Sequence, residues 1–337
     1  MKIFITGGSG FIGSNFLFSI LKLQQINILN LDNLTYASNS LKKEKLEGFD
    51  NYSFKKGNIN DSDLVSKLLS KFKPDVIINF AAETHVDNSI TEPSAFINTN
   101  INGTYNLLKC ALSFFNSLNI NDKEKFKFIQ ISTDEVYGSL SFNDPSFTEE
   151  SRFLPNSPYS ASKASADLLC RSWYKTYNFP TIITHCSNNF GPFQHSEKLI
   201  PKIIKNALSG YEIPIYGDGT NVRDWIFVTN HISAIYNVIK FGKPGQTYNI
   251  GGEMEISNIK LTEKICSILD KTLPQKNYES YAQLIKFVPD RLGHDLRYAI
   301  NCNKIKKDLG WHQETNFEEN LTYTVNWYCD FFKQKIS

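Results

Sequence analysis

The stretch "KIFITGGSGFIGSN", residues 2–15, decides the fold. A short apolar run typical of a buried strand passes directly into a glycine-rich turn, and a helical pattern follows. Gly8, Gly10 and Gly13 fit the G-x-G-x-x-G spacing, and Gly7 adds a G-x-x-G-x-x-G alternative. Glycines at such a turn let backbone N–H groups at a helix N-terminus approach a pyrophosphate. The stretch therefore predicts the first βα unit of a dinucleotide-binding domain.

An acidic residue stands where such a domain uses one. Asp32 ends the second predicted strand, roughly 20 residues beyond the glycine turn. A carboxylate there accepts hydrogen bonds from the adenosine ribose hydroxyls and repels a 2′-phosphate. We therefore expect NAD, rather than NADP, as the cofactor.

The N-terminal half alternates short β-branched runs with helical patterns. Strands are expected at 2–6, 26–32, 51–57, 76–82, 127–133 and 181–187, with a helix over 100–115. This alternation predicts an α/β fold: a Rossmann-type doubly wound parallel sheet with a smaller, less regular C-terminal substrate lobe. We expect residues 1–187, with a returning segment at about 222–250, to form the NAD-binding domain. The second, substrate-binding lobe is then 188–221 and 251–337, with helices at 258–270 and 315–333.

Composition excludes several classes of protein. The net charge of +2 and the lack of a basic stripe argue against a nucleic-acid binder. No apolar run reaches membrane-spanning length, and the chain begins directly on the first predicted strand, so we expect a cytoplasmic protein. The histidines and cysteines lack the spacing of zinc ligands, and no metal is expected.

Two further patterns suggest chemistry. Tyr159 and Lys163 lie four residues apart in "SPYSASKASAD", on one face of a predicted helix. An ammonium and an oxidised nicotinamide beside the phenol would lower its pKa and make it a base for an alcohol proton. In "ISTDEVYG", Asp134 and Glu135 end a buried strand, and interacting carboxyls can keep one group protonated while the other ionises. A solvated surface pair is the alternative in each case.

An ordered set of motifs carries a family resemblance over nearly the whole chain. The motifs are the glycine turn, "NLDNLTYA", "AAETHVDNSI", "ISTDEVYG", "SPYSASKASAD", "NNFGPFQHSEKLIP", "IYGDGTNVRDW", "YNIGG" and "PDRLGHDLRYAI". Together they resemble the extended short-chain dehydrogenase/reductase family that acts on nucleotide sugars, and within it the dTDP-glucose 4,6-dehydratases. The resemblance implies NAD-dependent oxidation of the sugar at C4, loss of water across C5 and C6, and hydride return to C6.

The resemblance, with the positions of the strand ends, also implies roles for individual residues. Tyr159 and Lys163 form the redox pair, Thr133 bonds the reacting oxygen, Asp134 is the acid and Glu135 the base. The expected cofactor-binding residues are Gly7, Gly10, Phe11, Ile12, Gly13, Asp32, Asn33, Leu34, Thr35, Asn58, Ile59, Phe80, Ala81, Ala82, Thr84, Thr99, Tyr159, Lys163 and Asn189. The expected substrate-binding residues are Thr84, Thr133, Asn188, Lys198, Leu199, Pro214, Ile215, Tyr216, Arg223, Asn258, Asp290, Arg291 and His294.

The chain departs from the family pattern at a few positions, and alternatives stay open. Thr84 replaces a common Ser, Asn58 a common Asp and Leu292 a common Pro, and His195–Ser196 stands where an aromatic residue and Pro are usual. A UDP- or CDP-hexose 4,6-dehydratase, a 4-epimerase, a decarboxylase and a non-catalytic dinucleotide-binding sensor are the alternatives. The resemblance further implies a homodimer that pairs the helices near 100–116 and 159–177.

Overall fold

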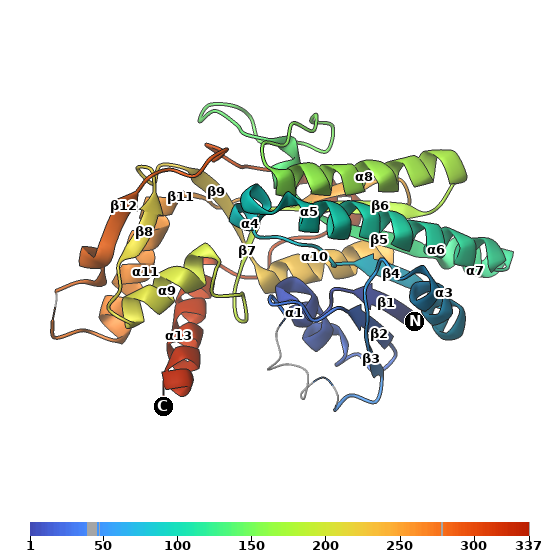
Figure 1. The fold of residues 1–337 in the computed structure, drawn as a ribbon, viewed down its shortest axis with the longest axis horizontal. Helices are drawn as coiled ribbons and strands as arrows, with labels where there is room; N and C mark the ends of the chain where they lie inside the picture. Colours follow the sequence, from blue (N-terminus) through green and yellow to red (C-terminus); the bar gives the residue numbers. More distant parts are fainter. Residues whose placement is uncertain (39–45, 47, 278, 337) are drawn as a thin grey trace.

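The computed structural model describes residues 1–38, 46, 48–277 and 279–336. Figure 1 shows two groups of elements side by side: a large sheet with its helices, and a smaller group that contains β8, β12, α9, α11 and α13. No helix among the described residues is long and apolar enough to cross a lipid bilayer.

The large sheet has seven parallel strands. In sheet order they are β10 (Thr247–Ile250), β6 (Thr181–Cys186), β5 (Lys127–Thr133), β4 (Val76–Asn79), β1 (Lys2–Thr6), β2 (Asn27–Asp32) and β3 (Tyr52–Lys56). Every residue of β4 and β6 is buried, which explains their nearly continuous apolar sequence. The predicted doubly wound parallel sheet is confirmed. The run predicted at 76–82 leaves the sheet after Asn79, and its small residues continue as a loop.

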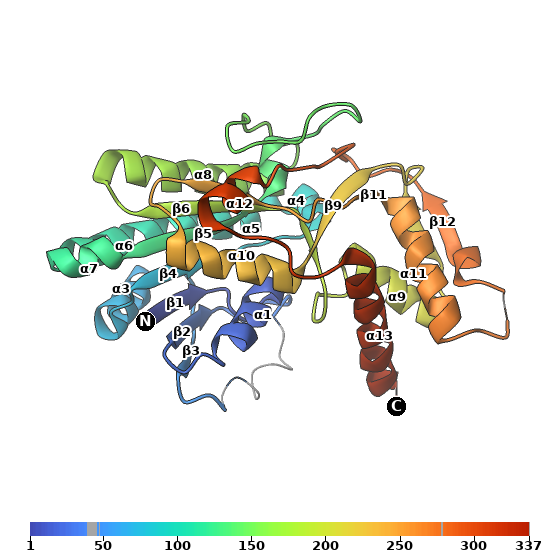
Figure 2. The same cartoon turned by 180° about the vertical axis from the view of Figure 1, so that it is seen from behind.

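Helices cover both faces of this sheet. On one face lie α1 (Phe11–Ile20), α10 (Val228–Phe241) and α12 (Asn303–Leu309), which Figure 2 shows in front. On the other lie α3 (Ser62–Phe72), α6 (Thr104–Ser117) and α8 (Pro158–Tyr177). Alternate residues of β1 serve the two faces, since Ile3 and Ile5 join the first core and Phe4 joins the second.

Short helical segments connect β4 with α6 and α6 with β5. They are α4 (Val86–Thr91), α5 (Pro93–Phe96), the π-helical segment η2 (Ile97–Gly103) and α7 (Ile120–Lys125). The helix predicted over 100–115 is therefore a π-helical turn that continues into α6 and ends at Ser117.

The smaller group has a core of its own, to which α9, α11 and α13 each contribute. Its elements are β7 (Asn188–Phe190), α9 (Leu199–Leu208), β8 (Ile213–Tyr216), β9 (Val222–Phe227), β11 (Glu255–Ser257), α11 (Asn258–Thr272), η4 (Tyr281–Leu284), β12 (Ile285–Val288) and α13 (Phe317–Ile336). β9 pairs with β7 and β11, then leads through α10 to β10 in the large sheet. The exact domain boundaries stay a prediction.

Candidate active site

The glycine turn joins β1 to α1 by a close passage of backbone. Gly7 has a φ of +71°, and a Cβ there would lie 2.5 Å from the backbone nitrogen of Ala81. A Cβ on Gly13 would lie 2.6 Å from the Gly7 carbonyl oxygen. The nearest atom to a Cβ on Gly10 is 3.4 Å away, so this glycine faces more open space. The turn therefore brings bare backbone and the first turn of α1 to the wall of a pocket.

Asp32 holds the turn and the following loop together. Its carboxylate accepts hydrogen bonds from the backbone N–H groups of Ser9 and Leu34, each at 2.8 Å. Asn33 and Thr35 line the pocket, whereas Leu34, at a φ of +54°, does not. A carboxylate has more acceptor positions than these two bonds occupy, so it can also receive hydrogen bonds from a ligand's hydroxyls.

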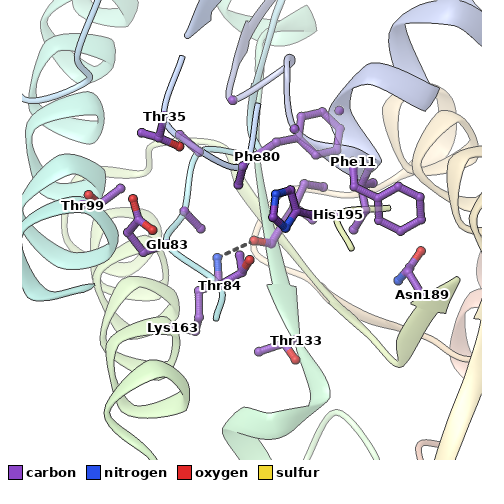
Figure 3. Close-up of a pocket in the computed structure, with 18 of the residues that line it drawn as sticks. Phe11, Thr35, Phe80, Glu83, Thr84, Thr99, Thr133, Lys163, Asn189 and His195 are labelled. Carbon is purple, nitrogen blue, oxygen red and sulfur yellow. Dashed lines mark hydrogen bonds between the residues drawn. The ribbon is translucent and has the colours of Figure 1, made fainter. Parts of the chain in front are cut away.

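One continuous pocket of about 380 Å³ runs from the glycine turn across the carboxyl ends of β1, β2 and β4 to β5 and β6 (Figure 3). It meets all the residues expected to bind cofactor except Leu34. They are Gly7, Gly10, Phe11, Ile12, Gly13, Asp32, Asn33, Thr35, Asn58, Ile59, Phe80, Ala81, Ala82, Thr84, Thr99, Tyr159, Lys163 and Asn189. Most of them follow successive strand ends of the large sheet or belong to the glycine turn, whereas Thr99, Tyr159, Lys163 and Asn189 come from η2, α8 and β7.

The start of α8 carries Tyr159 and Lys163. A reciprocal capping box between Ser157 and Ser160 fixes the helix N-terminus. Both functional side chains are buried, at 7% and 4% exposure, and both line the pocket. The Lys163 ammonium donates to the carbonyl oxygen of Ile131 in β5, at 2.7 Å. The helix therefore delivers a phenol and an ammonium to the same wall.

The pKa of Tyr159 in the protein alone is raised, whereas we expect it to be lowered when the cofactor is bound. Burial raises this pKa well above its ordinary value, the charges of Glu135 and Cys186 raise it further, and a hydrogen bond with Thr133 lowers it. In the protein by itself, desolvation of the phenolate outweighs every favourable contact. An oxidised nicotinamide ring, if bound beside the phenol, would act in the opposite direction because it is cationic.

The carboxyl pair begins a single 3-10 turn, η3 (Asp134–Tyr137), directly after β5. The Thr133 hydroxyl accepts from the Glu135 backbone N–H at 3.3 Å and donates to Asp134 Oδ1 at 3.4 Å. Asp134 is 1% exposed, and its Oδ2 has no hydrogen-bond partner among the described residues. All three side chains line the pocket, so Asp134 and Glu135 are not a solvated surface pair.

Adjacent in sequence, the two carboxyls experience different electrostatic fields. Burial raises the Asp134 pKa well above its ordinary value, and the neighbouring charges of Glu135 and Asp224 raise it further. Burial also raises the Glu135 pKa, but three cations oppose that effect: Lys198, Arg223 and Arg291. The proton is therefore retained more strongly on Asp134, and the negative charge is better supported on Glu135.

Lys198 and Arg223 approach from the smaller group of elements. Lys198 precedes α9, lines the pocket and donates to the Thr84 carbonyl oxygen at 2.8 Å. Arg223, in β9, is 5% exposed and lies 4.4 Å above the Tyr298 ring. It donates to backbone carbonyl oxygens, including that of Asp295 at 2.9 Å, and does not line the pocket. Its charge reaches Glu135 from behind the pocket wall.

The expected substrate residues divide into two sets. Thr84, Thr133, Asn188, Lys198 and Leu199 line the pocket. The others lie outside its wall, namely Pro214, Ile215, Tyr216, Arg223, Asn258, Asp290, Arg291 and His294. Two of them, Tyr216 and Arg291, are joined through an acid that the sequence analysis did not select, Asp87.

Asp87 lies in α4 and contacts two of the expected substrate residues outside the pocket wall. Its carboxylate accepts from the Tyr216 hydroxyl and pairs with Arg291, each at 3.4 Å. His294 pairs with Asp290 at 2.7 Å. The Nε of Arg291 is buried without a hydrogen-bond partner among the described residues. Of these groups, Arg291 lies close enough to Glu135 for its charge to act on that carboxyl.

Other lining residues were missed by the sequence analysis. They are Leu31, Ala37, Ser38, Gly57, Glu83, Ile131, Ser132, Cys186, Ser187, Gln194, Glu197 and Trp225, together with His195, noted only as a departure. Glu83, Ser132, Cys186 and Ser187 follow or end strands of the sheet, so the strand-end argument could have found them. Glu197 and Trp225 belong to the smaller group, and no sequence pattern around them indicates that they line the pocket.

A family model described as GDP-mannose 4,6 dehydratase matches residues 4–324. Among curated proteins, a dTDP-glucose 4,6-dehydratase of Escherichia coli is 48% identical over 98% of this chain and 94% of its own length. One from Haemophilus influenzae is 46% identical over 97% of this chain and 98% of its own length.

Solved structures agree with these matches. The dTDP-glucose 4,6-dehydratase of Bacillus anthracis, solved in complex with NAD, is 43% identical and superposes with a TM-score of 0.87, covering 99% of this chain and 98% of its own. That of Streptomyces venezuelae, solved with NAD and a second ligand, is 39% identical with a TM-score of 0.88 and the same coverage. With relatives this similar over nearly the whole length, the chain belongs to the dTDP-glucose 4,6-dehydratase family.

Proposed function

We propose that this protein dehydrates dTDP-glucose to dTDP-4-keto-6-deoxyglucose with NAD as its resident cofactor. The observation that carries the proposal is the unequal environment of Asp134 and Glu135. Burial and two nearby acids favour the protonated form of Asp134, whereas three cations favour the ionised form of Glu135. Elimination of water needs one acid and one base at the same time, and this pair supplies both.

The residues at the glycine turn fit NAD. Gly7 and Gly13 admit no side chain, and the backbone they expose lies at the start of α1, where a pyrophosphate is favoured. Asp32 faces the same pocket and suits ribose hydroxyls. When bound, NAD would accept a hydride from C4 of the sugar and return it to C6.

Tyr159 takes the proton of the C4 hydroxyl in this proposal. Thr133 holds the reacting oxygen, and Lys163 stabilises the phenolate. All three side chains line the pocket and are at least nine-tenths buried, which strengthens the interaction between the charged groups. Their arrangement suits removal of a proton from an alcohol.

Glu135 then removes the proton at C5, which the new C4 ketone has acidified. Asp134 protonates the departing C6 hydroxyl, so that water leaves. The buried Asp134 Oδ2, which has no partner among the described residues, is a suitable atom for this proton. Returning the C5 proton completes the 4-keto-6-deoxy product.

The remaining substrate contacts are proposed for the smaller group of elements. Lys198 and Asn188 lie in the pocket wall, and Arg291 with its unpartnered Nε lies beside it. A guanidinium fork suits diphosphate oxygens. We assign the nucleoside diphosphate to this side, with Leu199, Pro214, Ile215, Tyr216, Arg223, Asn258, Asp290 and His294 as further contacts or supports.

Incubation with dTDP-glucose tests the proposal. The expected product has a 4-keto group that absorbs in alkali, and its mass is lower than the substrate's by one water. Tyr159→Phe should abolish turnover while leaving the fold intact by circular dichroism. A product of unchanged mass would indicate a 4-epimerase instead. Mass spectrometry on a panel of dTDP-, UDP-, CDP- and GDP-hexoses identifies the preferred base and sugar.

We also propose a homodimer formed through α6 and α8. Both helices expose large apolar side chains, with Tyr105 at 47%, Leu168 at 54% and Tyr177 at 50%. Such residues cost little to expose singly, but together they favour burial against a second copy. Sedimentation equilibrium should give twice the monomer mass, and Leu168→Glu should shift it toward the monomer. An unchanged monomeric mass for the unmodified chain would exclude this interface.

The proposal also includes the domain division and the cellular location. The domain division given above is proposed to hold, and limited proteolysis near the predicted boundaries tests it. The six cysteines are all buried free thiols, which is usual in a reducing compartment, and we propose that the protein acts in the cytoplasm. Cell fractionation tests this location.

A further inference from the structure

Behind the pocket wall lies a chain of buried polar side chains that the proposed reaction does not use. The hydroxyl of pocket-lining Ser132 donates to Asp167 Oδ2 at 2.6 Å. The same oxygen lies 3.1 Å from His185 Nε2, and His185 Nδ1 lies 2.7 Å from the Tyr137 hydroxyl. All four side chains are at most 3% exposed. Burying an ionisable pair costs desolvation free energy. A pair in this position therefore suggests a role other than stabilising the fold.

The hydrogen-bond pattern determines where the protons lie. The Tyr137 hydroxyl donates to Asn249 Oδ1 at 2.9 Å. Asn249 Nδ2 donates to the Phe147 carbonyl oxygen at 3.2 Å, which fixes the orientation of the amide. Tyr137 has only one proton, so its oxygen must accept from His185 Nδ1–H. One further proton then lies between His185 Nε2 and Asp167 Oδ2.

That count makes the pair an imidazolium and a carboxylate, or their neutral tautomers, in either case with no net charge. Asp167 Oδ2 accepts from the Ser132 hydroxyl and also contacts His185 Nε2 at 3.1 Å. Its other oxygen, Oδ1, is buried without a partner among the described residues. Asp167 Oδ1 is therefore the carboxyl oxygen of the pair that is not already engaged by Ser132 or His185.

Lys163 lies one helical turn before Asp167 on the same side of α8. Burial lowers the Lys163 pKa, and Asp167 is the largest of the groups that raise it. The other groups facing the ammonium are the thiols of Cys170 and Cys186 and the carbonyl oxygen of Ile131. Among the groups that raise the Lys163 pKa, Asp167 is the carboxylate, and the helical spacing places it near the ammonium.

The opposite end of the chain supports the acid–base turn. Tyr137 is the last residue of η3, the turn that begins with Asp134 and Glu135. Its hydroxyl contacts His185 in β6 and Asn249 in β10. The orientation of η3 is therefore tied to the same imidazole that contacts Asp167.

We propose that Asp167 and His185 form a positioning unit that keeps Lys163 charged and at the same time anchors the turn carrying Asp134 and Glu135. The unit touches neither sugar nor cofactor and acts through Lys163 and Tyr137. It links the groups that oxidise C4 to the groups that eliminate water. This inference rests on the function proposed above and assigns that site two supporting residues.

Asp167→Asn and Asp167→Glu test the first link. Direct carbon-13 NMR titration of lysine-labelled protein, with Lys163→Arg to assign the resonance, reads the Lys163 pKa without substrate. Asp167→Asn should lower this pKa, because the favourable interaction of the ammonium with the Asp167 carboxyl is lost. The alkaline limb of the rate of C4 oxidation should move the same way. Asp167→Glu should restore both, which a purely structural defect would not do.

Tyr137→Phe tests the second link. It should leave C4 oxidation within about twofold of the unmodified protein yet slow water loss about tenfold or more, since a tenfold loss corresponds to a misplacement worth about 1.4 kcal/mol. Rapid-mixing absorbance of the reduced nicotinamide follows oxidation, and quenched-flow mass spectrometry follows dehydration. Glu149→Gln is the matched control, because Glu149 accepts from the Asn249 backbone N–H at the outer end of the chain and its amide can still accept.

The outcomes separate this inference from the proposed function. If the unmodified protein and Glu149→Gln form no 4-keto product, the proposed function fails. If both form it while Asp167→Asn keeps the original Lys163 pKa and alkaline limb, the positioning unit is refuted. Equal slowing of oxidation and water loss by Tyr137→Phe would refute the link to η3. If Asp167→Asn does not fold, the Lys163 titration in Asp167→Glu tests the first link instead. His185→Gln then tests the second link, since it should slow water loss as Tyr137→Phe does.

Discussion

The cofactor half and the substrate half of the pocket differ in how the chain builds them. The cofactor half consists of strand ends and one glycine turn, so residues such as Gly7, Asp32 and Ala81 meet because parallel strands end at one edge. The substrate half comes from loops and edge segments, and Arg223 and Arg291 stand behind the wall or beside it. One half is set by topology and the other by how distant segments pack.

The two halves meet at Glu135. Its carboxyl follows β5 of the large sheet, yet the cations that support its charge come from the smaller group. The difference suggests that oxidation depends mainly on the cofactor half and elimination on both. Substitutions can separate these contributions.

Glu135→Gln should have the largest effect. An amide cannot take the C5 proton, so dehydration should fall about 10²- to 10⁴-fold, the usual contribution of a general base. Oxidation at C4 should continue in part, because Tyr159 and Lys163 are unchanged. Reduced nicotinamide would then accumulate on the protein and can be followed by absorbance. Dehydration at the normal rate would show that Glu135 is not the base.

Arg291→Ala should act on the substrate half alone. Loss of a charged hydrogen-bond donor costs about 1.5–3 kcal/mol, so KM for the sugar nucleotide should rise roughly 10- to 100-fold. Affinity for NAD, measured by isothermal titration calorimetry, should stay the same. A parallel loss of NAD affinity would contradict the division between the halves.

Asp32→Asn should produce the converse result. The amide oxygen can keep one of the two backbone bonds, to Ser9 or Leu34, but the negative charge is lost. We expect NAD to bind about tenfold more weakly, which corresponds to about 1.4 kcal/mol. Discrimination against NADP should also decrease, while binding of the nucleotide product dTDP stays unchanged. Retained discrimination would mean that another group excludes the 2′-phosphate.

The smallest expected effect is a change in folding stability caused by Asp134→Asn. The size of this change should depend on pH. The folded-state pKa of Asp134 is raised, so the native protein binds more protons than the unfolded chain above the ordinary aspartate pKa. Stability is then greatest below the unfolded-state pKa and falls as pH rises through the folded-state pKa. An asparagine side chain does not ionise, so the variant does not lose stability in this way as the pH rises.

Urea denaturation at several pH values measures that dependence. The variant should gain stability relative to the unmodified protein as pH rises, by on the order of 1 kcal/mol for each unit of pKa shift. A constant difference across the same pH range would show that Asp134 ionises as readily in the native state as in the unfolded chain.

The sequence by itself determined the sheet, the glycine turn and the pairing of Tyr159 with Lys163. Each is encoded within one short segment: strand periodicity, glycine spacing, or a four-residue interval on one helix. Strand ends of a parallel sheet meet whatever the loops do, so the cofactor half followed from these local patterns. Even there, Leu34, which we expected to bind cofactor, does not line the pocket, and its backbone N–H donates to Asp32; its role stays a prediction.

Tertiary structure alone decided which carboxyl keeps its proton. Asp134 and Glu135 are neighbours in sequence, and Arg223 lowers the pKa of both, but Asp224 raises only that of Asp134, whereas Lys198 and Arg291 lower only that of Glu135. The same holds for the Asp167–His185 pair, which joins α8 to β6. The field at a buried group sums over every charge nearby in space, and folding, not local sequence, sets those distances.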